Sequence, residues 1–342
     1  MSKLKISVVA LAISAIMSVP AFAACEKVRF SDVGWTDITA TTAATSVVLG
    51  ALGYDADVTV LSVPVTYASM KNKDIDVFLG NWMPTMEGDI RPYLDDGSVE
   101  SLRVNLEGAK YTMAVPRKTY DAGLKSFADI AKFKDKLGGK IYGIEPGNDG
   151  NRLILDMIAA DQFGLGGFEL VESSEQGMLA QVARAVKANE WIVFLGWEPH
   201  PMNANFDMAY LDGGDDWFGP NYGGATVYTN IRAGYAAECP NIGALLNNLE
   251  FSLKMENEIM GAILNDGADP KDAAKAWLAA KALAARPPAA LQATKQLMRD
   301  ATAIKTVMDR EREVFAERLK SAEAAEAFLA FRERRPPDFS KL

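Results

Sequence analysis

The chain has 342 residues, of which 49% are apolar and 24% are charged, and its formal net charge is −9. That length and apolar content predict two or more globular units with real cores and exclude a disordered chain. The acidic balance excludes nucleic acid and an anionic membrane surface as partners, whereas it does not repel a cationic ligand.

The N-terminus has the pattern of a secretory signal peptide. Lys3 and Lys5 precede an apolar run over residues 6–19, and Ala21-Phe22-Ala23 fits the small-residue rule for signal cleavage. We therefore expect residues 1–23 to be a signal peptide that is removed after Ala23. Later segments contain no uninterrupted apolar stretch of about 18 residues, so we expect no direct insertion of the mature protein into a membrane.

The chain contains two cysteines, Cys25 and Cys239. In an exported protein an even pair of this kind favours a single disulfide, which would tie the mature N-terminus to a distant segment. The alternative is a lipoprotein, because residues 22–25 loosely match a lipobox. That alternative places Phe22 where leucine is usual and leaves Cys239 without a partner.

From Val28 onward, short β-branched or aromatic runs alternate with helical segments. This alternation is typical of a parallel sheet with covering helices. A first series contains strands at 28–33, 58–63 and 76–80 and helices at 42–52 and 65–72. A second series contains strands at 111–115, 140–144, 168–173 and 191–196 and helices at 127–133, from about 149, and at 175–189.

The two series predict two α/β lobes. Residues 24–110 are expected to begin the first lobe and residues 111–222 to form the second. Residues 223–280 contain a strand at 225–231 followed by helices, and a disulfide to Cys25 would return them to the first lobe. This discontinuous topology leaves a ligand cleft between the lobes.

Residues 281–342 form a tail of different composition. It has 13 basic and 9 acidic residues, a net charge of +4, and it lacks glycine, tryptophan and tyrosine. Spaced apolar residues favour two or three amphipathic helices, broken near Arg286-Pro287-Pro288 and Arg335-Pro336-Pro337.

The residues that most enzymes need are missing. His200 is the single histidine of the chain, which excludes multi-histidine zinc sites and leaves a Ser-His-Asp triad only one candidate base. No phosphate-binding glycine loop follows a strand. We therefore expect no catalytic residues, no metal and no cofactor. His200 lies between two prolines, and a structural role is the simpler interpretation.

Large aromatic residues stand at the ends of predicted strands. Two similar motifs, FLGNWMP at 78–84 and FLGWEP at 194–199, each end an apolar run and then present a tryptophan. Ligands of open α/β sheets bind beyond the carboxyl ends of the strands. A quaternary ammonium has no N–H, so aromatic faces bind it, each contributing about 0.5 to 2 kcal/mol. The alternative for any single tryptophan is a place in the core.

Five stretches carry a family resemblance: GWTDI, FLGNWMPTM, KYTMAVP, GIEPGNDGN and FLGWEPHPMN. With them, residues 25–280 resemble the periplasmic choline-binding proteins of bacterial ABC importers, within the wider group that binds glycine betaine and proline betaine. The resemblance implies a two-lobed, type II periplasmic binding protein of the α/β class. It also implies a periplasmic protein that is not an enzyme and that delivers choline to permease subunits in the inner membrane.

The resemblance further implies the ligand-binding residues. Trp35 and Trp82 of one lobe and Tyr111 and Trp197 of the other would form an aromatic box, and Asp37 and Asn148 would serve the hydroxyl end of choline. A betaine ends in a carboxylate that an aspartate repels, so Asp37 favours choline over betaine and tolerates cations such as acetylcholine. Asn148 is alternatively a helix cap, but Asp149 is available for capping instead.

The tail has a second resemblance, to the C-terminal segment of enoyl-CoA hydratases of the crotonase superfamily. The stretches ALAARPPAALQATKQLMR and EREVFAERLKSAEAAEAFLAFRERRPPDF carry it. Nothing upstream matches the catalytic part of that superfamily, so no hydratase activity is implied. Two alternative functions follow from the tail alone: crotonase-like chemistry on an acyl-CoA, and a scaffold that self-associates through the tail.

Overall fold

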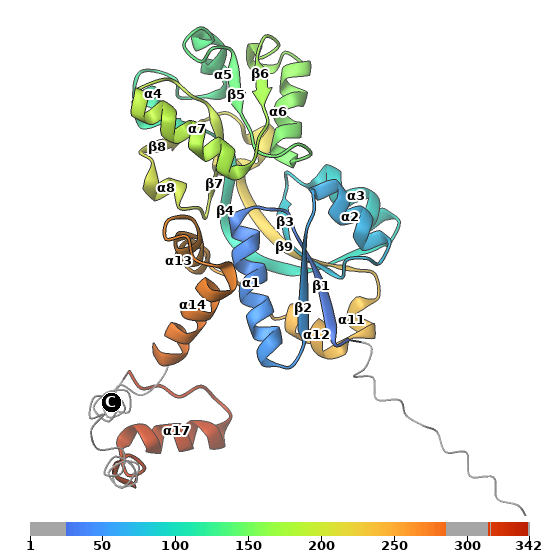
Figure 1. Ribbon diagram of the computed structural model, residues 1–342, viewed down its shortest axis with the longest axis vertical. Helices are drawn as coiled ribbons and strands as arrows, with labels where there is room; N and C mark the ends of the chain where they lie inside the picture. The colour runs from blue at the N-terminus through green and yellow to red at the C-terminus, as the bar shows by residue number, and fades with distance from the viewer. Residues whose placement is uncertain (1–24, 285–313, 315, 341–342) are drawn as a thin grey trace, which may run out of the picture.

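The computed structural model describes residues 25–284, 314 and 316–340, and two α/β lobes make up most of it (Figure 1). The first lobe contains the elements that precede the long strand β4 and the helices that follow β9. These elements are β1 Lys27–Asp32, α1 Thr36–Ala51, β2 Asp55–Val60, α2 Val63–Lys71, β3 Val77–Met83, α3 Glu87–Asp95, α11 Tyr235–Glu238, α12 Pro240–Leu246, α13 Leu253–Leu264 and α14 Pro270–Ala284.

The second lobe lies between β4 and β9 in the sequence. Its elements are α4 Arg117–Asp121, α5 Phe127–Ile130, η1 Ala131–Phe133, β5 Lys140–Tyr142, α6 Asp149–Ala159, η2 Gln162–Gly164, β6 Glu169–Val171, α7 Glu175–Ala188, β7 Phe194–Glu198, α8 Met202–Asn205, β8 Met208–Tyr210, α9 Asp215–Phe218 and α10 Pro220–Gly223. The expected alternation of strands and helices is therefore present in both lobes.

Two long strands connect the lobes: β4, Val99–Pro116, and β9, Gly224–Arg232. The sheet is continuous, in the order β2-β1-β3-β9-β4-β7-β5-β6, with β8 paired to β4. Figure 1 shows β4 and β9 curving from one lobe into the other. Several register shifts interrupt their pairing between Ser101 and Ala109, and such irregularities bend a sheet.

The expectation of a parallel sheet is only partly correct. β1 pairs in parallel with β2 and β3, and β5 pairs in parallel with β6 and β7, but β9 and β4 are antiparallel to their neighbours. Strand β4 also begins at Val99, twelve residues before the expected strand. Its first half is largely exposed or half-buried and mostly polar, so it lacks the apolar run by which a strand is found.

The disulfide between Cys25 and Cys239 is confirmed, with a Cα–Cα distance of 5.7 Å. Cys25 therefore has no thiol for lipid attachment, which excludes the lipoprotein alternative. The bond joins the start of β1 to the segment between α11 and α12. In addition, α13 and α14 pack against α1. The segment after β9 thus returns to the first lobe.

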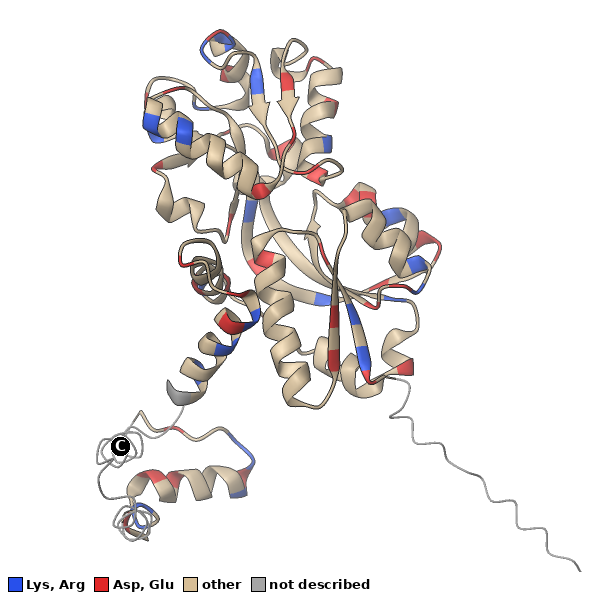
Figure 2. Ribbon diagram, viewed as in Figure 1, with Lys and Arg blue, Asp and Glu red and all other residues tan. Residues whose placement is uncertain are grey.

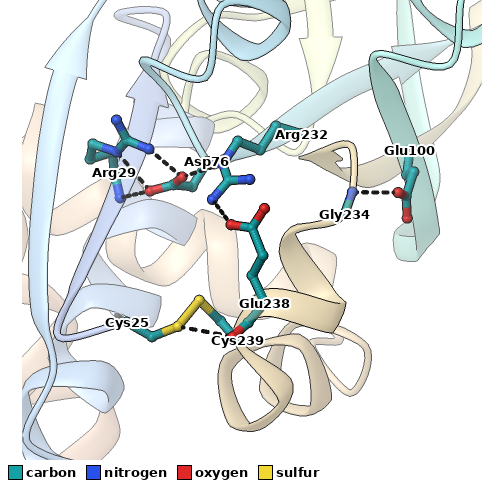
Figure 3. A network of polar contacts seen from close by, with 8 residues as sticks. All are labelled: Cys25, Arg29, Asp76, Glu100, Arg232, Gly234, Glu238 and Cys239. Atoms are coloured by element: carbon teal, nitrogen blue, oxygen red, sulfur yellow. Dashed lines mark hydrogen bonds and ion pairs between the residues drawn. A yellow bond between two sulfur atoms is a disulfide. The ribbon is translucent and has the colours of Figure 1, made fainter. Parts of the chain in front are cut away.

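A charged network reinforces this junction (Figure 3). Asp76 accepts hydrogen bonds from the guanidinium groups of Arg29 and Arg232, and Arg232 also binds Glu238. Burial opposes ionisation of Asp76, but the bonds from Arg29 and Arg232 outweigh it and lower the pKa of this carboxyl. The network joins β1 to β9 and α11 independently of the disulfide.

In the described part of the tail, α14 continues to Ala284 and a later helix, α17, spans Ala322–Glu333. Helix α17 ends at Glu333 with Arg334 as its C-cap, before the expected break at 335–337, and the Arg335 side chain binds Glu326. Its surface is partly apolar, because Phe331 is 85% exposed. The expected break near 286–288 and the expected signal peptide at 1–23 lie outside the described residues.

Candidate ligand-binding site

A small cavity lies between the lobes, and all the side chains that line it are buried. Its lining consists of aromatic, acidic and amide side chains with one isoleucine. The lining residues are Trp35, Asp37, Trp82, Tyr111, Ile144, Asn148, Asp149 and Trp197. The structure therefore brings together all six residues that were expected to contact a ligand.

Both lobes contribute to this lining. Trp35 precedes α1, and Asp37 lies in the first turn of that helix, while Trp82 is the penultimate residue of β3. Trp197 is the penultimate residue of β7. Tyr111 does not stand at a strand end, contrary to expectation: it lies inside β4, directly opposite Trp197 in the antiparallel pair.

The aromatic rings of the cavity are arranged around Tyr111. Its ring centroid lies 6.1 Å from that of Trp82 and 6.2 Å from that of Trp197, both in edge-to-face geometry. All four large aromatic side chains are at most 5% exposed. Edge contacts between neighbours leave other ring faces available to a ligand, and aromatic faces attract cations.

Asp37 is buried at the edge of this aromatic group. Its Oδ2 accepts a hydrogen bond from Nε1 of Trp82 at 3.1 Å. Its Oδ1 is also buried and has no hydrogen-bond partner among the described residues. Burial, followed by the negative charge of Glu175, raises the pKa of Asp37 to about 8. The carboxyl is thus poorly compensated until a donor or a cation enters the cavity.

Asn148 lines the cavity and caps α6 at the same time, so the expectation that Asp149 would replace it as the cap is wrong. Asn148 Oδ1 accepts from the backbone N–H of Asn151 at 2.9 Å and from the Tyr111 hydroxyl at 2.8 Å. Its backbone is extended, which is the conformation of an N-cap residue. Asp149 is the first residue inside the helix.

Sequence reasoning missed Ile144 and Asp149 as lining residues. Asp149 Oδ1 accepts from Asn148 Nδ2 at 3.0 Å, and its buried Oδ2 has no hydrogen-bond partner in the described chain. Burial raises the pKa of this carboxyl to about 6. The motif GIEPGNDGN already contained both residues, but the spacing alone does not tell which side chains of a turn face a cavity.

Five hydrogen bonds at three places, one of them an ion pair, join the lobes beside the cavity. Trp35 Nε1 donates to Glu145 Oε1 at 2.7 Å, and Thr36 donates from its backbone and its hydroxyl to Glu175. Arg152 of α6 donates to the Thr85 carbonyl and pairs with Asp89 of α3 at 2.8 Å. Burial raises the pKa of Glu145 to about 7, although the bond from Trp35 opposes this.

His200 contacts residues of its own lobe beside this closure. Its Nδ1 accepts from the backbone N–H of Met202 at 2.9 Å, and its Nε2 lies 3.2 Å from Glu175 Oε1. Its ring packs against Trp197 with a centroid distance of 4.8 Å. The residue is buried and does not line the cavity, which agrees with a structural role.

Acidic side chains dominate the surroundings of the cavity. Figure 2 shows acidic positions at the first turns of α1 and α7, where the lobes meet. The described residues that line the cavity include no lysine or arginine. Among the described residues, no group of three metal-ligating side chains is present, and no helix is long and apolar enough to cross a membrane. The arrangement therefore favours an organic cation.

The model of the OpuAC family, the substrate-binding domain of ABC-type glycine betaine transport systems, matches residues 26–280. The chain belongs to the OpuAC family. This family membership makes it a substrate-binding protein of a transporter and not an enzyme. It also explains the two-lobed fold with the cavity at the junction, which is the periplasmic binding protein fold.

Two solved structures resemble this OpuAC-family chain strongly. One, an ABC-transporter choline-binding protein in complex with choline, is 69% identical, with a TM-score of 0.76, over 78% of this chain and 92% of the other. A second, described as the choline-binding protein in an unliganded semi-closed conformation, is 72% identical, with a TM-score of 0.70, over 74% of this chain and 88% of the other.

A curated relative covers less of the chain. The uncharacterized protein ORF1 of Chromohalobacter salexigens is 54% identical over 154 residues, which are 45% of this chain and 98% of that protein. The family match ends at residue 280, so it leaves the tail outside the likeness. The resemblance of the tail to crotonases stays a prediction.

Proposed function

We propose that this protein binds choline in the cavity between its lobes and delivers it to the permease subunits of an ABC importer. The observation that carries this proposal is the lining itself: four aromatic side chains from two lobes surround a small space that also contains the carboxyls of Asp37 and Asp149. The 69% identity to a protein whose structure is described as a choline complex supports the same ligand.

The trimethylammonium end of choline requires aromatic faces, since it has no N–H to donate. Trp35, Trp82, Tyr111 and Trp197 supply these faces, and all four are buried. Each desolvated contact between a cation and a ring contributes about 2 kcal/mol. The rings come from both lobes, so a closed protein binds the cation better than an open one, and the ligand shifts the population toward closure.

The hydroxyl end of choline requires a hydrogen-bond acceptor. Asp37 Oδ1 and Asp149 Oδ2 are buried acceptors without partners among the described residues, and Asn148 Nδ2 uses one of its two N–H groups on Asp149. A hydroxyl donates to one carboxylate and accepts from the amide. The carboxylate of glycine betaine has no proton to donate, and Asp37 and Asp149 repel it where they are ionised.

A thermal-shift panel on the mature protein tests this proposal. Choline is expected to raise the melting temperature as a ligand of the folded state, acetylcholine to raise it less, and glycine betaine to raise it least. Titration calorimetry then gives the three dissociation constants. Equal shifts for choline and glycine betaine would contradict the role of the aspartates, and the absence of a choline shift would reject the ligand.

The proposal includes export to the periplasm with cleavage after Ala23. The signal-like pattern of residues 1–23 supports it, as does the disulfide, which forms in oxidising compartments. Intact-mass measurement of the protein purified from the periplasm is expected to show a chain that begins at Ala24. A mass that retains residues 1–23 would contradict this cleavage site.

A further inference from the structure

Glu175 is buried where α7 of the second lobe meets α1 of the first, outside the cavity lining. We propose that Glu175 is a positioning residue that couples lobe closure to the assembly of the cation site, by capping α1 from the opposite lobe. This inference rests on the proposed function, because the site that it assembles is the choline site.

The first argument concerns the N-terminus of α1. The first N–H groups of a helix lack intrahelical acceptors, and a side chain at the N-cap position usually accepts from one of them. The N-cap residue of α1 is Trp35, whose side chain makes no such bond. Glu175 Oε2 instead accepts from the backbone N–H of Thr36 at 2.7 Å, and Oε1 accepts from the Thr36 hydroxyl.

This cap exists only when the lobes are together, since acceptor and donor belong to different lobes. Thr36 stands between Trp35 and Asp37, both of which line the cavity. A carboxylate at a helix N-terminus also interacts favourably with the helix dipole. Closure therefore completes α1 and fixes the two ligand-lining side chains that flank Thr36.

The second argument concerns His200, which holds Glu175 from its own lobe. His200 Nδ1 accepts from the backbone of Met202, so the proton of the neutral ring is on Nε2 and points at Glu175 Oε1, 3.2 Å away. The other side of the His200 ring packs against Trp197. Glu175 is thus connected to lining residues of both lobes: to Trp197 through His200, and to Trp35 and Asp37 through Thr36.

The third argument concerns charge. Four titratable side chains interact with Glu175 from the elements around it: Asp32 of β1, Asp37 of α1, Glu145 before α6, and His200 after β7. Three of these are acids, and no lysine or arginine among the described residues pairs with Glu175. The negative charge of Glu175 therefore makes the closed cavity more attractive to a cation. It also disfavours ionisation of the neighbouring carboxyls while the closed cavity is empty.

Two pairs of variants of the full mature chain separate the cap from the charge. Glu175→Gln removes the charge and points an amide N–H at a donor, whereas Glu190→Gln removes a charge from an exposed position just beyond the other end of α7. Thr36→Val removes the hydroxyl bond and keeps the charge, whereas Thr36→Ser keeps both. Choline affinity is measured by calorimetry between pH 6 and pH 9.

Glu175→Gln is expected to weaken choline binding at least tenfold and to move the pH dependence of the affinity to lower pH, because Asp37 then ionises more easily. Thr36→Val is expected to weaken binding severalfold with an unchanged pH profile. The Glu190→Gln and Thr36→Ser controls should match the wild type. A merely structural role of Glu175 would not move the pH profile.

The inference is overturned if the choline affinity of Glu175→Gln stays within twofold of the wild-type affinity at every pH. If Glu175→Gln lacks a cooperative melting transition, Thr36→Val decides, and binding equal to that of Thr36→Ser overturns the proposal. If the wild-type protein itself does not bind choline, the proposed function is wrong, and the test says nothing against Glu175 in particular. Small-angle scattering of the ligand-free chains then tests whether Glu175 favours closure of the lobes. A larger radius of gyration for Glu175→Gln than for Glu190→Gln supports the role of Glu175 as the cap of α1. Equal radii of the two variants reject it.

Discussion

Tyr111 joins the aromatic and the polar ends of the cavity. Its ring lies edge-on to both Trp82 and Trp197, and its hydroxyl donates to Asn148 across a distance of 2.8 Å. A residue with an apolar body and a polar tip is suited to this position because both parts are satisfied when buried. The orientation of the Tyr111 ring in the aromatic group is therefore linked to the Asn148 amide, which would bind the hydroxyl end of the proposed ligand.

Replacing Trp197 with alanine is expected to weaken choline binding by ten- to a hundredfold. The indole supplies a desolvated face worth about 2 kcal/mol to a cation, and about 1.4 kcal/mol corresponds to tenfold in affinity. The variant also loses buried area, so its melting temperature should fall while unfolding stays cooperative. Titration calorimetry and thermal melting measure the two effects.

The matched control for this substitution is Trp191→Ala. Trp191 lies in the same lobe, packs on Phe133 and lies near the Lys136 ammonium, and does not line the cavity. The substitution Trp191→Ala is expected to lower the stability of the folded protein and to leave its choline affinity within twofold of the wild type. Equal affinity losses in the two variants would show that the loss reflects general destabilisation.

The affinity for choline is expected to rise with pH between about 6 and 8. The pKa of Asp37 is raised to about 8 by burial and then by the charge of Glu175. A bound cation favours the ionised carboxyl and lowers this pKa, so binding releases a proton wherever Asp37 is protonated in the free protein. By linkage the dissociation constant then falls by up to about tenfold per pH unit and levels off above pH 8.

Asp37→Asn is the variant that checks this pH dependence. It removes the titration near pH 8 and leaves the smaller contributions of Glu145 and Asp149, whose pKa values are raised to about 7 and about 6. Calorimetry in buffers with different ionisation enthalpies counts the released protons. A slope between pH 7 and pH 8 equal to that of the wild type would exclude Asp37 as the titrating group.

Helix α6 meets the cavity through its first turn, where a glycine permits close approach. A Cβ at Gly150 would lie 2.1 Å from the Tyr111 hydroxyl oxygen, which is far inside van der Waals contact. The turn also carries Asn148 as its cap and Asp149 as its first residue. A larger residue at position 150 therefore displaces the side chain that connects the two ends of the site.

Gly150→Ala is expected to weaken choline binding about tenfold, although alanine favours helices by up to about 1 kcal/mol over glycine. The displaced Tyr111 loses its bond to Asn148 and its place beside Trp82. Gly261→Ala in α13 is the control, because a Cβ there meets nothing within 4 Å. The control should gain about 0.5 to 1 kcal/mol of stability with unchanged binding, measured by denaturant titration and calorimetry.

At the scale of the molecule, the two strands β4 and β9 make one sheet from two lobes, and the cavity forms where the lobes close. The segment after β9 returns to the first lobe. The disulfide and the Arg29–Asp76–Arg232 network attach it there (Figure 3). Neither the disulfide nor this network includes a residue that lines the cavity. Stability and ligand affinity are therefore expected to respond to different substitutions.

The double variant Cys25→Ser/Cys239→Ser tests this separation. Loss of a cross-link between residues 214 positions apart is expected to lower the free energy of unfolding by about 2 to 5 kcal/mol, mostly through the freer unfolded chain. The choline dissociation constant should stay within twofold of the wild type, since the charged network still holds the junction. A large loss of affinity would show that the disulfide helps to shape the site.

The sequence by itself determined the α/β class and the paired cysteines, and the family resemblance of its short motifs implied six of the eight residues that line the cavity, because strand periodicity and motifs are local properties of the chain. Only the tertiary structure decided the mixed direction of the sheet, the early start of β4, the double role of Asn148 and the contribution of Asp149. The cap that Glu175 places on α1 also required the structure. These features depend on which groups meet across distant segments, and burial and hydrogen bonding between such groups leave no periodic signal in the sequence.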